Sequence, residues 1–227
     1  MELSYEIRRS TKRRKLTITV ERDRRIIVHV PESMPDAKIR QVVESKRQWI
    51  YEKISHSQKY QGLPHPPGKE LVSGESALYL GRLYRVEIIK DGSLEVEFAQ
   101  RFLIPETLIG RRVEALREWY IDRAKAKITP RVMMHARSLG VDVNGVKIVD
   151  NHYRWGSCTV NDNVNLNWRL IKAPVFVIDY VIVHELSHLI ESNHTPRFWN
   201  IVRTQVATME KAKAWLKEHG QLLEETI

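Results

Sequence analysis

The most apolar stretch of the chain also carries polar side chains at helical spacing, and this combination restricts how the chain can fold. It runs from residue 175 to residue 190, and its second half reads VIVHELSHLI. His184 and His188 are four residues apart, so on a helix both would lie on one side, one turn apart. Burying two imidazoles and the Glu185 carboxylate would cost free energy unless a partner satisfied them. The pattern therefore predicts a largely buried helix whose polar groups share a partner.

The spacing H-E-x-x-H is typical of zinc hydrolases. We predict that His184 and His188 bind one metal ion and that Glu185 contacts a water on that ion. The alternative is a pair of core histidines hydrogen-bonded to carbonyl or carboxylate groups, but that alternative leaves Glu185 unexplained. Because the ligands are nitrogen atoms, zinc is the expected ion, although manganese, nickel and cobalt also suit such sites.

A catalytic zinc site usually takes three protein ligands and leaves one position open, and His194 is the leading candidate for the third. It follows His188 by six residues, beyond a helix end expected at Ser192–Asn193. Asn193 readily adopts the left-handed conformation, which would return the chain toward the ion. His194 also begins the next helix, whose dipole favours a neutral, ligating ring. Glu191 is the alternative ligand, which we interpret instead as solvated or as a neighbour of the ligands.

The composition is that of a globular protein with no membrane span. The chain has 227 residues, of which 42% are hydrophobic, enough for one large domain or two small ones. Its apolar runs are shorter than the roughly 18 residues that cross a bilayer, and residues 1–15 lack the apolar core of a secretory signal. Cys158 is the single cysteine. It excludes an internal disulfide, and we expect a cytoplasmic protein.

The N-terminal region is strongly basic within a chain of net charge +9. Residues 1–30 hold nine Lys or Arg against four Asp or Glu. A basic surface attracts nucleic acid or another polyanion without selecting among them. The alternative is that these charges are the solvated faces of amphipathic strands, because they alternate with LTITV and RIIVHV.

The first half of the chain predicts strands with one helix among them. Alternation predicts a β-hairpin over residues 15–30, and apolar spacing predicts an amphipathic helix over 36–60 with Asp36 as its cap. Further strands are expected from SALYLGRLYRVEIIK through RFLIP, with a turn at Asp91–Gly92. This N-terminal β-rich part is expected to be one domain, residues 1–104.

The second half predicts a zincin-like domain over residues 105–227, giving an α+β fold overall. A long helix after Pro105 should be interrupted at Pro130 and end at Leu139–Gly140. Three strands lie between residues 145 and 170, followed by the helix with the histidines, which begins near Pro174. A last helix is expected from Thr195–Pro196 toward Gly220.

Four segments of this half carry a family resemblance. They read YRWGSCT at 153–159, VNLNWRLIKAP at 164–174, DYVIVHELSHL at 179–189 and NHTPRFW at 193–199. Together they resemble the YgjP-like metallopeptidase family, which is related to the SprT-like and other zincin-fold zinc proteins. The resemblance implies zinc bound by His184, His188 and His194, with Glu185 as general base toward a zinc-bound water. It implies a peptidase, and also an alternative, since some members look like metal-dependent nucleotide hydrolases acting on UTP.

The segment before the metal helix supplies the candidate substrate-binding residues. In a peptidase, YRWGSC would be an edge strand that pairs with an extended substrate, and Gly156 would permit close approach. In a nucleoside triphosphate pyrophosphatase, Arg154 would hold phosphates, while Trp155, Trp168 or Trp199 would stack a base. Tyr153 is a candidate donor to a developing oxyanion.

Each of these residues also has a structural interpretation. The tryptophans would be core or pocket walls, and Arg154 would pair with Asp150 or Asp179. Cys158 is interpreted as a small buried residue. A third hypothesis for the whole chain is a non-catalytic nucleic-acid-binding module with structural zinc. The open three-histidine ligand set argues against it, because closed structural sites usually recruit a fourth Cys or His.

Overall fold

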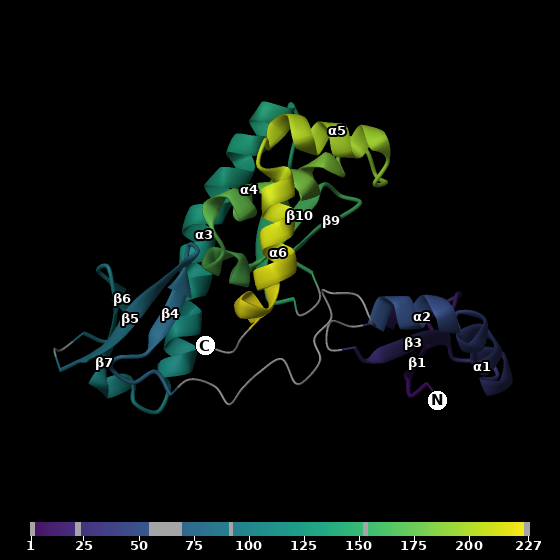
Figure 1. Cartoon of the computed structure of the whole chain (residues 1–227), viewed down its shortest axis with the longest axis horizontal. Helices are drawn as coiled ribbons and strands as arrows, with labels where there is room; N and C mark the ends of the chain where they lie inside the picture. The colour runs from purple at the N-terminus through teal and green to yellow at the C-terminus, as the bar shows by residue number, and fades with distance from the viewer. Residues whose placement is uncertain (1–2, 21–23, 55–69, 91–92, 152–153, 225–227) are drawn as a thin grey trace. The chain divides into compact units, whose positions relative to one another are not determined.

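The computed structural model describes residues 3–20, 24–54, 70–90, 93–151 and 154–224. The chain divides into two compact units, residues 1–64 and 65–227. This division differs from the boundary expected after residue 104, because strands before that point share a hydrophobic core with the helix that carries His184 and His188. Helices and strands are mixed in both units, as the α+β prediction requires (Figure 1).

The first unit is a three-stranded sheet with two helices. The elements are β1 (Glu6–Ser10), β2 (Thr17–Val20), β3 (Ile26–Pro31), α1 (Asp36–Ser45) and α2 (Arg47–Ile54). The predicted hairpin is confirmed, since β2 and β3 are antiparallel, but β1 adds in parallel to the other side of β3. Arg9 of β1 donates to the carbonyls of Glu32 and Met34 and to Asp36. These contacts join β1 to the start of α1.

The helix expected over residues 36–60 is two helices within the described part. Lys46 leaves the helical conformation, with φ −106° and ψ 9°, and separates α1 from α2. Residues 55–60 lie outside the described residues. Asp36 was expected to cap the helix, but Pro35 holds that position and the Asp36 carboxylate pairs with Arg9 at 2.5 Å.

A four-stranded sheet opens the second unit and packs on a long helix. Its strands, in the spatial order β4-β5-β7-β6, are β4 (Ser76–Tyr79), β5 (Arg82–Ile89), β6 (Glu97–Phe98) and β7 (Phe102–Pro105). The helix is α3 (Arg112–Leu139), preceded by the short η1 (Glu106–Leu108). Phe102 and Trp119 pack edge to face with centroids 5.1 Å apart, so an aromatic contact joins β7 to α3. The turn expected at Asp91–Gly92 lies outside the described residues.

Pro130 does not interrupt α3, contrary to the sequence-based expectation. A proline inside a helix cannot donate to the carbonyl four residues earlier, and this costs about 3 kcal/mol. Ile128 and Val132 on either side are completely buried. Burial of each contributes roughly 1.5–3 kcal/mol, which offsets the cost of the proline. The helix ends as predicted at Gly140, whose φ is 67°.

A second sheet and three helices complete the unit. The elements are β8 (Gly145–Val149), β9 (Gly156–Cys158), β10 (Asn163–Asn167), η2 (Trp168–Lys172), α4 (Val175–Ser187), α5 (Pro196–Gln205) and α6 (Met209–Glu224). The sheet order is β8-β10-β9, which leaves β9 at an edge among the described strands. The last helix was expected to be continuous to Gly220, but it breaks after Gln205, where Val206 is extended. In the described residues, no helix combines the length and apolarity that a membrane crossing requires.

Two aspartates, half-buried Asp179 and the more exposed Asp150, connect the helices of this unit. Asp179 of α4 receives two hydrogen bonds of 2.6 Å from Arg131 of α3 and lies 3.1 Å from His135 Nε2. Asp150, after β8, accepts hydrogen bonds of 2.5 Å from Arg117 of α3 and Arg169 of η2. Asp179 therefore fixes α4 against α3, and Asp150 fixes η2 against α3.

Asp150→Asn tests the second of these connections. Burial opposes ionisation of Asp150, but hydrogen bonds from Arg169 and Arg117 outweigh it and lower its pKa from 3.8 to about 2. Because the folded-state pKa lies below the unfolded value, the ionised carboxylate stabilises the fold above about pH 4, and this contribution disappears toward pH 2. We expect Asp150→Asn to lower the melting temperature by about 2–4 °C at pH 7.

Thermal melts of the wild type and the variant from pH 7 to pH 2 check this prediction. The two melting temperatures should converge at the acid end. Asp122→Asn is the matched control, since among the described residues Asp122 pairs with Lys125 alone, on the exposed face of α3. A difference that persists unchanged at pH 2 would contradict the assignment.

Candidate metal centre

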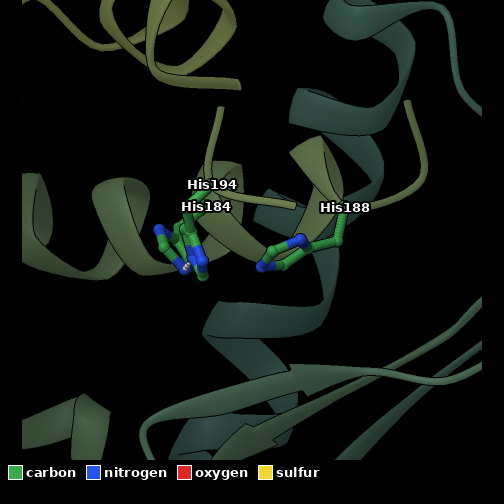
Figure 2. Close-up of side chains that lie close together, drawn as sticks. All are labelled: His184, His188 and His194. Atoms are coloured by element: carbon green, nitrogen blue, oxygen red, sulfur yellow. Dashed lines mark hydrogen bonds between the residues drawn. The ribbon is translucent and has the colours of Figure 1, made fainter. Parts of the chain in front are cut away.

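Helix α4 carries the first two histidines at its C-terminal end. Within the helix, Val181, Ile182, Val183 and Leu186 are buried in the core of the second unit. Each of these side chains contributes roughly 1.5–3 kcal/mol by burial, enough to hold polar neighbours in their midst. His188 is the C-cap, so His184 and His188 lie one turn apart at the end of the helix (Figure 2).

The turn after α4 brings His194 back to the end of the helix. It is held by backbone hydrogen bonds from Leu189 to Leu186 and from Glu191 to Ser187. The expected left-handed residue is not used, because Asn193 is not among the described residues with positive φ. The predicted cap at Thr195 is confirmed, since its hydroxyl accepts from the Phe198 amide and starts α5. Figure 2 shows the His194 ring beside the His184 ring.

The three imidazoles converge. His194 Nε2 lies 3.1 Å from His184 Nε2, and one nitrogen from each of the three rings lies within 4.8 Å of the others. Two nitrogens bound to one tetrahedral zinc at about 2.0–2.1 Å stand about 3.4 Å apart. The shortest separation fits this value, and ring rotation must draw the widest one closer. Among the described residues this is the single group of its kind, and Glu191 is not part of it.

The electrostatics of the rings suit a cation ligand. Burial, followed by the neighbouring His188, His194 and Lys213, lowers the pKa of His184 to about 4. Burial and His188 also lower the pKa of His194. Both rings are therefore neutral near pH 7 and each has a nitrogen lone pair to share. The buried Nδ1 of His184 has no hydrogen-bond partner among the described atoms, so this ring is poorly satisfied by protein groups alone.

An aromatic wall supports the histidines, and sequence reasoning did not identify it. Phe198 is completely buried, and its ring centroid lies 4.6–5.0 Å from those of all three histidines. Trp199 stacks on His194 at 5.4 Å with an interplanar angle of 27°. The sequence did contain a signal for these contacts. Phe198 and Trp199 lie in the first turn of the helix that starts at Thr195–Pro196, directly after His194. Trp199 was considered as a base-stacking residue, whereas here it packs on a candidate ligand.

Glu185 lies against the backbone of β9. A Cβ added to Gly156 would meet Glu185 Cγ at 2.6 Å and Oε1 at 2.8 Å, closer than packed atoms come. Gly156 was expected to permit the close approach of a substrate, and in the structure the Glu185 side chain makes that close approach. Glu185 is only 8% exposed, and burial raises the pKa of its carboxyl to about 7, with Arg154 opposing the shift. The structure thus places the Glu185 carboxyl against the edge strand, in surroundings that favour its protonated form more than water does.

The other candidate residues are distributed differently. Arg154 is exposed, and the ion pairs considered for it are not formed, because Asp150 and Asp179 are bound by other arginines. Trp155 packs on the core, with its ring 3.6 Å from the position of a Cβ on Gly220. Tyr153 lies outside the described residues.

Trp168 and Cys158 have structural surroundings. Trp168 is 2% exposed and stacks on Tyr120 at 6.0 Å, so it belongs to the core. Cys158 is half-buried, and burial followed by the charge of Glu185 raises the pKa of its thiol. It is not part of the histidine group.

The chain is similar to one protein family and to two solved structures. A protein-family model described as YgjP-like, metallopeptidase domain, matches residues 14–219. No curated protein matches the chain. Two similar solved structures are metallopeptidase zymogens: abylysin of Pyrococcus abyssi (20% identity, TM-score 0.38, covering 44% of this chain and 98% of that one) and jannalysin of Methanocaldococcus jannaschii (23%, 0.36, 42% and 97%). Since the family match spans nearly the whole sequence, the chain belongs to the YgjP-like metallopeptidase family.

Proposed function

We propose that this protein is a zinc-dependent peptidase in which His184, His188 and His194 bind the ion and Glu185 is the general base. The observation that carries the proposal is the convergence of three imidazole nitrogens within 4.8 Å beside a buried glutamate. Three nitrogen ligands leave a fourth position open, as in catalytic zinc sites. The family match supports a metal-dependent hydrolase of peptides.

The donor set favours zinc over harder cations. All three ligands are imidazoles, whereas magnesium and calcium prefer oxygen donors. When bound, zinc would supply Lewis-acid polarisation of a carbonyl and a lowered pKa for coordinated water. His184 and His194 keep a lone pair available because burial lowers the pKa of both rings, so that they stay neutral near pH 7.

Glu185 would accept a proton through its carboxylate and pass it to the leaving amine. Its position supports this role, because Gly156 limits its carboxyl on one side and helix α4 holds its backbone on the other. A carboxyl in a buried setting also binds and releases protons nearer to neutral pH than an exposed one.

The substrate would bind as an added strand. Strand β9 is at the edge of its sheet among the described strands, and it contacts α4 directly. An extended peptide could pair with its unused backbone groups, with the scissile bond carried past Glu185. This arrangement favours unfolded or loop segments over compact domains, because only an extended backbone can join a sheet edge.

The two other functions weighed from sequence have less support. A pyrophosphatase needs a phosphate-binding cluster, and near Glu185 Arg154 is the cation whose charge reaches the carboxyl. Neither the family match nor the similar structures point to a nucleotide or a nucleic acid. A purely structural zinc is disfavoured by the open, three-ligand set.

Removal of a ligand tests the metal site. His194→Ala should lose bound zinc at equimolar metal, since two imidazoles bind far more weakly than three. Metal content after gel filtration, measured by elemental analysis, checks this. His219→Ala is the control, because His219 stacks on Trp215 of α6 and should keep zinc at the wild-type level. Equal zinc in both variants would exclude His194 as a ligand.

Glu185→Gln tests the general base. The amide fits the same space but cannot accept a proton, so zinc content should be unchanged while cleavage of casein or an unfolded peptide falls by about 10²–10⁴-fold. Chelator should abolish wild-type cleavage, and added zinc should restore it. Unchanged cleavage by the variant would remove Glu185 from the mechanism.

Gly156→Ala tests the positioning of that base. The new methyl group must displace the Glu185 side chain, because its nearest contacts are the Cγ, Oε1 and Cδ atoms of that flexible group. We expect kcat/KM for peptides to fall about 10²-fold with zinc binding intact. Gly110→Ala is the control, since a Cβ there meets nothing within 4 Å. Equal activities would show that the contact does not hold the carboxyl in place.

A further inference from the structure

The chain segment that leads into β9 is fixed by one buried amide. Asn167, at the end of β10, is only 1% exposed. Its side-chain amide donates to the carbonyls of Asn151 at 2.5 Å and Arg154 at 3.2 Å, and its backbone amide donates to the Trp155 carbonyl at 2.8 Å. Its Oδ1 accepts from the Arg169 amide at 3.0 Å. The backbone of Arg154 is therefore held in one place relative to the sheet.

The side chain of Arg154 carries an unneutralised charge near the candidate site. It is exposed, and no ion pair with it is found among the described residues. Asp150 and Asp179, the two acids predicted as possible partners of Arg154, are each bound by other arginines. Gly156, two residues farther along, touches the Glu185 carboxyl. Arg154 therefore lies just before the edge strand β9, two residues from the contact with Glu185.

Arg154 lies two residues before Gly156, which contacts the Glu185 carboxyl, so its backbone is held close to that buried group. The Glu185 carboxyl faces Gly156, so it is turned toward the backbone of β9. The guanidinium keeps its five donors available on the solvent side. Such a fork binds carboxylates with two parallel hydrogen bonds, and lysine cannot reproduce that geometry.

We propose that Arg154 is a specificity-determining residue that selects peptides with an acidic side chain close to the scissile bond. This inference rests on the proposed peptidase function and names its substrate class. A peptide paired with β9 would place alternate side chains over the strand, and one of them would reach the segment that Asn167 fixes. A carboxylate there meets a partner already in position, whereas an ammonium meets a like charge.

Binding of short fluorescein-labelled peptides tests the inference separately from hydrolysis. Three peptides share one uncharged, extended sequence and carry Glu, Gln or Lys at the central position. Their dissociation constants are measured by anisotropy on zinc-loaded Glu185→Gln protein, and the measurement is repeated with Arg154→Glu and Lys147→Glu added. Lys147 makes the matched control, because it is exposed in the middle of β8, the opposite strand of the same sheet.

We expect the Glu peptide to bind about fivefold more tightly than the Gln peptide, and the Lys peptide more weakly than either. Arg154→Glu should reverse this order, while Lys147→Glu should leave it unchanged. Equal binding of the three peptides, binding of none, or an order that Arg154→Glu does not alter would overturn the inference. If the binding preference holds but wild-type protein hydrolyses no peptide, the proposed peptidase function fails and the acidic-peptide site remains.

Discussion

The contact between Gly156 and Glu185 is the constraint on which the candidate site depends. The Glu185 side chain fills the space over Gly156, where a Cβ would meet its Cγ at 2.6 Å, so strand β9 comes this close to helix α4 only because residue 156 has no side chain. The contact leaves Glu185, which is 8% exposed, enclosed between the strand and its own helix. A larger residue at position 156 would displace the Glu185 side chain from this place.

Sequence spacing was enough to predict the helix and the shared side of His184 and His188, because a four-residue interval has one geometric consequence on a helix. The Thr195–Pro196 start of α5 was equally local, since a cap and a proline act within one turn. The partners of these residues were not local. The contacts of Phe198 with three imidazoles and of Gly156 with Glu185 arise from packing between elements distant in the chain. The periodicity of apolar residues in the sequence does not predict such contacts.

The sequence-based expectations that failed did so for different physical reasons, and at Pro130 a local preference was outweighed by tertiary contacts. Pro130 should break a helix, yet the burial of Ile128 and Val132 holds α3 continuous. Asn193 was given a left-handed turn that the chain does not need, because hydrogen bonds from Glu191 and its neighbours already close the turn. Strand β1 pairs with β3 in parallel and is not joined to it by a tight turn, so no turn signal in the sequence predicted this pairing.

Helix α4 and the turn after it contribute the three histidines in different ways. The backbone of His184 and His188 is fixed by the apolar core around α4 and by the Arg131–Asp179 pair, so it is set when the protein folds. His194 comes from a surface turn and is exposed, yet its Nε2 already lies 3.1 Å from His184 Nε2. The wider separations within the 4.8 Å group are therefore those to His188 (Figure 2). Rotation of the His188 ring at the C-cap of α4 would close the group around an ion without moving the helix backbone.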